Sequence, residues 1–263
     1  VADATTLTYG GATIDLGAFT LTFSGMGEFD GSNGLNMNNG GSEIAVTGDT
    51  ADIDDDITIA VGAGGATIDI DEDATISGDL STNEDFTLEI ASGKTLDYTG
   101  ADVTFGDDTV TLAETGELAN TSIIDVDGTS TFNITQGATI SGPIDLDGGT
   151  LDIDTSMTIS GDITHTTASD LEIAGGETLT YTGAAIVSTS ELDLLETGIL
   201  ANTNAISVGT GSTLNIENGA TVSGPIILND GLLDIDATTA ISGNITHTAS
   251  STLDVANTFA LNY

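Results

Sequence analysis

Closely spaced aspartates are the residues of this sequence best suited to chemistry. The pattern Asp-Ile-Asp occurs at long, regular intervals, in the pairs Asp69 and Asp71, Asp152 and Asp154, and Asp234 and Asp236. Carboxylate oxygens are the ligands that Ca²⁺ prefers, so we expect these residues to form a cation-binding ladder, with Ca²⁺ as the candidate cofactor. The alternative is a solvated acidic face that keeps the protein soluble, because no aspartate-rich stretch matches a defined calcium loop.

The remaining ionisable residues offer little for catalysis. His165 and His247 occupy equivalent Thr-His-Thr sites in successive long repeats, too far apart to act as a pair, and we interpret both as outward or corner residues. Lys94 is the only Lys or Arg. There is no nucleophile elbow, phosphate loop or zinc-ligand spacing. The sequence therefore predicts no catalytic residues and no enzymatic activity.

A repeated apolar pattern predicts the elements that position these residues. Ten apolar-polar-apolar triplets occur, and the residue eight positions after the start of each is again apolar. Period-two alternation indicates short strands with one face buried. The triplets begin at Ile68, Leu88, Val110, Phe132, Leu151, Leu171, Leu192, Leu214, Leu233 and Leu253. Their middle residues are expected to form one outward column, namely Asp69, Glu89, Thr111, Asn133, Asp152, Glu172, Asp193, Asn215, Asp234 and Asp254.

The spacing of the triplets predicts an all-β fold. Successive triplets start 19 to 22 residues apart, and four such coils make a near-repeat of 82 or 83 residues. A third short strand follows the Ser-Gly corner in several coils. We therefore predict a right-handed parallel β-helix of about 13 coils with three strands per coil. Residues 1–263 are expected to form a single β-solenoid, less regular over residues 1–67 and with ten registered coils over residues 68–263.

Composition limits the partners of the chain. With 42 Asp and Glu residues against one Lys, the formal net charge is −41. Nucleic acid and anionic membrane surfaces would be repelled, and no run approaches the roughly 18 apolar residues of a membrane span. The scarcity of Lys and Arg together with abundant Gly, Thr, Ser, Asn and Asp favours an extracellular or cell-surface location. Cysteine is absent.

The coil length and the motif Gly-Ala-Thr-Ile-Ser-Gly at 137–142 resemble a known class of bacterial surface proteins. This class comprises the filamentous-haemagglutinin-like and autotransporter-passenger β-helices. The resemblance covers most of the chain and is architectural. It implies secretion and a surface or matrix role, and it transfers no catalytic residue. Enzymes of this fold that cleave acidic polysaccharides need basic groups to hold uronate, which Lys94 alone cannot provide.

The first and last coils share one phase of the short repeat. Leu7-Thr-Tyr9 matches Leu261-Asn-Tyr263, and no capping helix is predicted beside either. Uncapped coils expose unpaired backbone, so we expect head-to-tail self-association, with Leu7, Tyr9, Leu261 and Tyr263 as candidate interface residues. The leading hypothesis is a structural subunit or shaft of a secreted filament or biofilm-matrix fibre, bridged by divalent cations. The alternative is an adhesin stalk or passenger that binds glycan or a host surface, and a polysaccharide-degrading enzyme ranks last.

Overall fold

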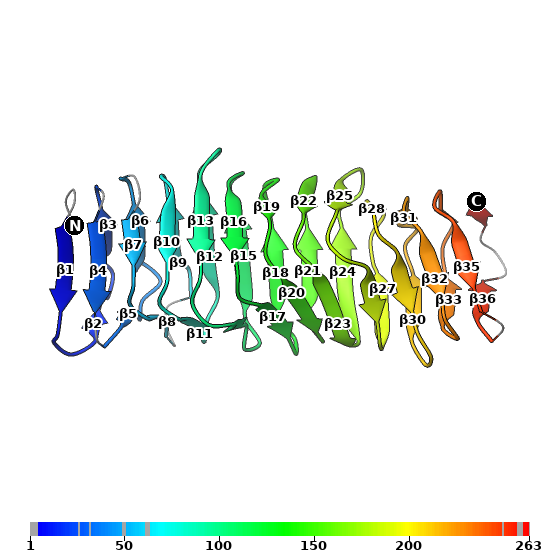
Figure 1. The fold of residues 1–263 in the computed structure, drawn as a ribbon, viewed down its shortest axis with the longest axis horizontal. Helices are drawn as coiled ribbons and strands as arrows, with labels where there is room; N and C mark the ends of the chain where they lie inside the picture. The colour runs from blue at the N-terminus through cyan, green and yellow to red at the C-terminus, as the bar shows by residue number, and fades with distance from the viewer. Residues whose placement is uncertain are drawn as a thin grey trace. The chain divides into compact units, whose positions relative to one another are not determined.

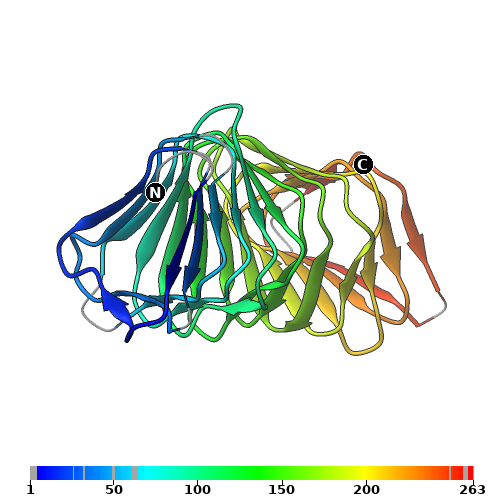
Figure 2. The ribbon, with the colours of Figure 1, turned by 60° about the vertical axis from the view of Figure 1, so that its left-hand side comes forward.

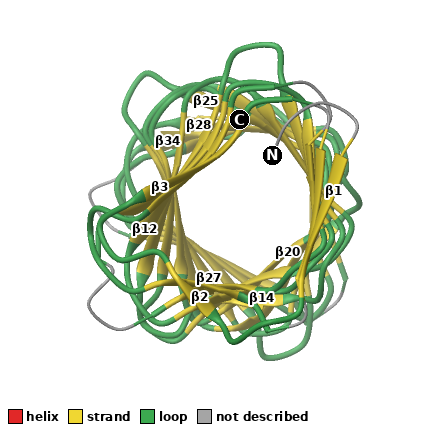
Figure 3. Cartoon of the chain, turned by 90° about the vertical axis from the view of Figure 1, so that its left-hand side faces the viewer, coloured by secondary structure: helices red, strands yellow, loops and turns green. Residues whose placement is uncertain are grey.

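The computed structural model describes residues 5–25, 27–31, 33–48, 51–60, 64–248, 250–256 and 260–262. Every helix or strand among these residues is a β-strand, and Figure 3 shows only strands and loops. The named strands pair in parallel and form a β-solenoid of about 11 turns. The predicted all-β parallel solenoid is confirmed, with fewer turns than the roughly 13 expected, whereas its right-handedness stays a prediction.

Each coil contributes three strands, one to each of three sheets, which we call the first, second and third faces. The chain divides into two compact units, residues 1–125 with 138–142, and residues 126–137 with 143–263. We call them unit 1 and unit 2. Strand β17 (Ile124–Asp127) has residues in both.

Unit 1 contains the earlier strands of each face (Figure 1). Its first face has β1 (Thr5–Tyr9), β4 (Gly27–Gly31), β7 (Ala51–Ile53), β10 (Ala74–Ile76), β13 (Thr95–Tyr98), β16 (Glu117–Asn120) and β19 (Thr139–Ile140). Its second face has β2 (Ile14–Asp15), β5 (Leu35–Met37), β8 (Ile57–Ile59), β11 (Leu80–Thr82) and β14 (Val103–Thr104). Its third face has β3 (Thr20–Phe23), β6 (Glu43–Val46), β9 (Ala66–Ile70), β12 (Phe86–Ile90) and β15 (Thr109–Ala113).

Unit 2 repeats this arrangement, and Figure 2 shows its successive coils in green to red. Its first face has β22 (Met157–Ile159), β25 (Thr178–Tyr181), β28 (Ile199–Asn202), β31 (Thr221–Val222), β34 (Thr239–Ala240) and β37 (Leu261–Asn262). Its second face has β20 (Ile144–Asp147), β23 (Ile163–Thr167), β26 (Ile186–Ser188), β29 (Ile206–Val208), β32 (Ile226–Leu228) and β35 (Ile245–His247). Its third face has β18 (Thr131–Ile134), β21 (Thr150–Ile153), β24 (Ser169–Ile173), β27 (Glu191–Leu194), β30 (Thr213–Ile216), β33 (Leu232–Ile235) and β36 (Thr252–Val255).

Apolar side chains fill the interior of each unit. Along a strand, buried and more exposed residues alternate, as in the five residues of β9. In unit 1 the rings of Phe23 and Phe29 meet edge to face with centroids 6.2 Å apart. In unit 2 the interior is lined by aliphatic residues such as Leu214, which is fully buried. Burying one such side chain contributes roughly 1.5–3 kcal/mol, so the interior is the main source of stability.

The coils before Ile68 are regular but longer. Leu21 lies in register with Ile44, and Ile44 with Ile68, so each of these coils exceeds the 19 to 22 residues found later. A search at the shorter period therefore misses them. The structure extends the parallel ladder to β1, where Leu7 pairs with Phe29. Within the part of the chain that the structure describes, no helix is long and apolar enough to span a membrane.

Candidate functional site

The outward side of the third face carries the densest carboxylates in unit 1. Asp69 on β9 lies in register with Glu89 on β12. Burial between the neighbouring strands raises the pKa of Asp69 to about 6, and the nearby charges of Asp71 and Glu89 raise it further. Burial, followed by the charge of Glu114, likewise raises the pKa of Glu89. The folded protein therefore holds these carboxylates ionised at an energetic cost, which a proton or a cation would relieve.

The third face of unit 2 is acidic over more coils. Neighbouring strands place carboxylates side by side, in the pairs Asp152 and Glu172, Asp170 and Asp193, and Asp234 and Asp254. Burial raises the pKa of Asp193 to about 6, assisted by the charge of Glu191 and opposed by a hydrogen bond with Asn215. The Oδ1 atoms of Asp193 and Asn215 are both buried without a hydrogen-bond partner. These oxygens belong to the class of ligand that a hard cation prefers.

The predicted outward column is wrong at two equivalent places. Glu89 lies beside Ala113 rather than Thr111, and Asp193 lies beside Asp170 rather than Glu172. In both coils the strand is displaced by two residues, so the corner that follows is shorter. That tighter corner is turned by a residue with positive φ, Glu114 at 69° and Glu196 at 56°. A left-handed non-glycine residue is uncommon, so apolar spacing alone does not reveal the displacement.

The six predicted metal ligands are found as three separate pairs. In each pair the first aspartate is half-buried on a third-face strand, and the second is exposed just after the strand ends. The second charge raises the pKa of the first in all three pairs, although burial is the larger cause each time. Among the described residues, no group of three or more His, Cys, Asp or Glu is arranged to hold a metal ion. One pair therefore offers only part of a coordination shell, and binding stays a prediction.

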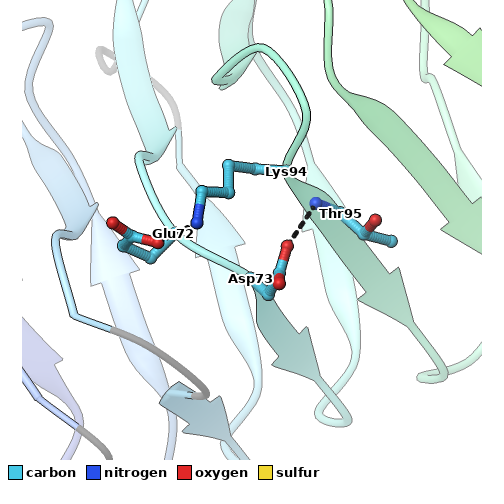
Figure 4. A network of polar contacts seen from close by, with 4 residues as sticks. All are labelled: Glu72, Asp73, Lys94 and Thr95. Atoms are coloured by element: carbon cyan, nitrogen blue, oxygen red, sulfur yellow. Dashed lines mark hydrogen bonds and ion pairs between the residues drawn. The ribbon is translucent and has the colours of Figure 1, made fainter.

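Lys94 is engaged at the corner between β12 and β13. Its Nζ forms an ion pair with Glu72 of the preceding coil (Figure 4). Beside it, the backbone N–H of Thr95 donates to Oδ1 of Asp73 at 2.9 Å. The ion pair sits at the surface, where such contacts contribute little to stability. Lys94 therefore neutralises one carboxylate of its own coil stack.

The repeated tyrosines have a structural role that the sequence did not reveal. The hydroxyl of Tyr98 accepts the backbone N–H of Leu80 at 3.1 Å and donates to the carbonyl of Ala101 at 2.6 Å. Tyr181 makes the equivalent bonds to Ile163 at 3.0 Å and Ala184 at 2.7 Å. Each tyrosine thus joins two successive coils at the corner between the first and second faces.

A glycine makes room for each of these hydroxyls. A Cβ atom at Gly183 would lie 2.7 Å from the Tyr181 hydroxyl and 2.2 Å from the carbonyl oxygen of Gly161. Gly100 has the same relation to Tyr98. The Tyr-Thr-Gly sequence therefore recurs because the tyrosine bond and the close approach of the backbone both require it.

The interpretation of His165 as an outward or corner residue is wrong. Its side chain is 2% exposed and points inward from β23, in register with Ser188 of β26. Its Nε2 lies 2.9 Å from the carbonyl oxygen of Glu191, and its Nδ1 is buried without a partner. Burial lowers the pKa of His165, although the charges of Asp145 and Asp147 oppose this effect. Alternation from the buried Ile163 would have placed His165 inside. His247, its repeat equivalent, is exposed as predicted.

The candidate interface residues lie partly outside the described structure. Tyr9 is half-buried on β1, and the side chain of Leu7 on the same strand is outside the described residues. Leu261 is half-buried on β37, where it pairs with Thr239 of β34. Tyr263 is outside the described residues. Their role in assembly stays a prediction.

Comparisons with known proteins leave the argument on the structure. No protein-family model matches this chain, and no curated protein or solved structure matches it either.

Proposed function

We propose that this chain is a structural protein, the β-solenoid shaft or subunit of an extracellular fibre. The observation that supports this most is the parallel register, which continues from coil to coil within each unit over a buried apolar interior. Such a ladder resists unfolding and proteolysis because each coil is held by its neighbours. The resemblance to bacterial surface β-helices in coil length and corner motif is the basis for the extracellular location.

Copies of the chain are the proposed partners. A parallel ladder extends in the stacking direction wherever strand edges meet, because each edge strand presents N–H and C=O groups to the next. Coils of one copy would continue those of another without new side-chain chemistry. This contact is heterologous, so it generates a fibre rather than a closed oligomer.

Divalent cations are the proposed regulators of this assembly. A chain with a net charge of −41 repels its copies, and the repulsion is screened by salt and relieved by bound cations. The pairs Asp152 with Glu172 and Asp234 with Asp254 point outward, where a cation held by one copy can take ligands from water or a neighbouring copy. We therefore expect Ca²⁺ to promote association.

Electron microscopy and sedimentation velocity of the purified chain, with Ca²⁺ and with a chelator, test the proposal. We expect fibres or larger assemblies in Ca²⁺ and smaller particles after chelation. Particles of one size in every condition would contradict self-assembly and would favour the adhesin stalk. A glycan array is the next measurement in that case.

A further inference from the structure

The second face of unit 2 has an outward column without charge. His165 pairs with Ser188, which places Thr164 beside Val187, and the register then continues from β26 through β29 and β32 to β35. The column consists of Thr164, Val187, Ser207, Ile227 and Thr246. On the third face of the same coils, outward positions carry Glu172, Asp193, Asp234 and Asp254.

Two branched aliphatic side chains are exposed on this column. Val187 is 52% exposed and Ile227 is 40% exposed, although each lies in a strand whose flanking residues are buried. The nearest carboxylates lie at its limits, Asp145 beside Thr164 in the ladder and Asp230 after the end of β32. A β-branched residue suits a strand, but solvent-exposed Thr would serve as well. Exposed Val and Ile on an uncharged surface indicate a contact.

We propose that this column is a lateral docking surface for a second copy of the chain. Charge identifies the occupant, because a copy with a net charge of −41 can approach closely only where both surfaces lack carboxylates. The order of the residues identifies the geometry. Thr164, Val187, Ser207, Ile227 and Thr246 form a sequence that is nearly symmetric about Ser207.

A twofold axis at Ser207 makes the column complementary to itself. Val187 of one copy then packs on Ile227 of the other, and the same contact occurs a second time, as an isologous interface requires. The outer threonines face each other in the same way. Since strands are spaced about 4.8 Å apart, the two Asp145 carboxylates lie about 29 Å apart along the stack. A parallel alignment would instead place these carboxylates against each other.

The area of this contact predicts a weak dimer. Five strands span about 24 Å in the stacking direction, so each copy buries only a few hundred Å², below the roughly 800 Å² of a standard interface. Screening of the remaining charge must assist, so pairing is expected at high ionic strength and not at low ionic strength. The proposal goes beyond the fibre hypothesis, because a stalk would expose the same face.

Sedimentation equilibrium in about 0.5 M NaCl with a chelator tests the pairing without Ca²⁺ bridging. We expect a concentration-dependent dimer for the unaltered chain. Ile227→Asp should weaken it about tenfold or more, because each dimer would bury two unpaired carboxylates. The matched control is Thr180→Asp, which adds one carboxylate at an exposed outward position of β25 on the first face of the same unit. It should leave the dimer unchanged.

A charge-reversal pair tests the twofold geometry. In the double variant Val187→Lys with Ile227→Asp, each new lysine should face a new aspartate of the other copy, so dimerisation should recover relative to Ile227→Asp. Circular dichroism checks that every variant is folded. A monomer at every concentration would overturn the proposal. Equal losses in Ile227→Asp and Thr180→Asp would do the same, and failure of the double variant to recover would overturn the twofold geometry.

Discussion

In unit 2 the second and third faces belong to the same coils and differ in what they present to solvent. Glu172, Asp193 and Asp234 point outward from the third face, whereas Val187 and Ile227 point outward from the second. Beneath both faces the interior is aliphatic. In a solenoid each face is a separate column of residues, so a sequence can make one face repel its copies and leave another free to bind them. The stacking itself is unaffected by this choice.

The largest effect should come from the interior that the two faces share. Leu214 lies under the third face and Ile206 under the second, in the same coil, and both are fully buried. We expect Leu214→Ala and Ile206→Ala each to lower the free energy of unfolding by about 2–5 kcal/mol. Urea unfolding followed by circular dichroism measures both. A large loss on one face only would show that the faces differ in their interior as well.

The corner that leads into the second face should contribute less. Tyr181→Phe leaves the N–H of Ile163 and the carbonyl of Ala184 without their partner, at a cost of about 1–3 kcal/mol. The neighbouring exposed residue provides the control, since Thr180→Ala should change stability by less than about 0.5 kcal/mol. Equal unfolding midpoints for Tyr181→Phe and the unaltered chain would contradict the assigned role of the hydroxyl.

Beneath the second face, acid should destabilise the protein through His165. Because burial lowers its pKa below the ordinary value of 6.5, the unfolded chain binds a proton at a pH where the folded chain does not. The stability that depends on neutral His165 is complete above pH 6.5 and is lost as the pH falls. His165→Leu should therefore reduce the loss of melting temperature between pH 7 and pH 5. A loss as large as that of the unaltered chain would exclude this residue as its source.

On the third face, acid should have the opposite effect through Asp193. Its pKa of about 6 lies above the ordinary value of 3.8, so the folded chain binds the proton more tightly than the unfolded chain. The destabilisation is absent below pH 3.8 and complete above pH 6. Asp193 is half exposed, so solvent screening limits the effect to less than about 1 kcal/mol. Asp193→Asn should raise the melting temperature by about 1–3 °C at pH 7.5 and by less at pH 4.5.

A control at an uncharged outward position separates charge from side-chain size. Thr180→Asn changes the side chain without removing a carboxylate, so its melting temperature should follow the unaltered chain at both pH values. A gain for Asp193→Asn that is the same at pH 4.5 and pH 7.5 would show that hydrogen bonding or packing, rather than charge, is responsible.

The sequence predicted the coils well because apolar alternation and glycine corners are local signals. The strand starting at Leu151 and its partner at Ile159 lie where the triplet rule puts them. The two-residue displacement near Glu114 and Glu196 depends on left-handed backbone at a non-glycine residue, which composition does not indicate. The inward His165 and the tyrosine bonds depend on how neighbouring coils stack. The uncharged second face emerges only when register joins residues from successive coils.

The acidic third face is tested most directly by melting temperature in Ca²⁺ and in Na⁺ at equal ionic strength. The measurement uses the unaltered chain and the double variant Asp152→Asn with Glu172→Gln, which removes one pair of adjacent carboxylates. We predict that Ca²⁺ raises the melting temperature of the unaltered chain more than Na⁺ does, and that the double variant shows a smaller difference. Equal melting temperatures in the two salts would contradict the account and would leave the third face as a solvated acidic surface.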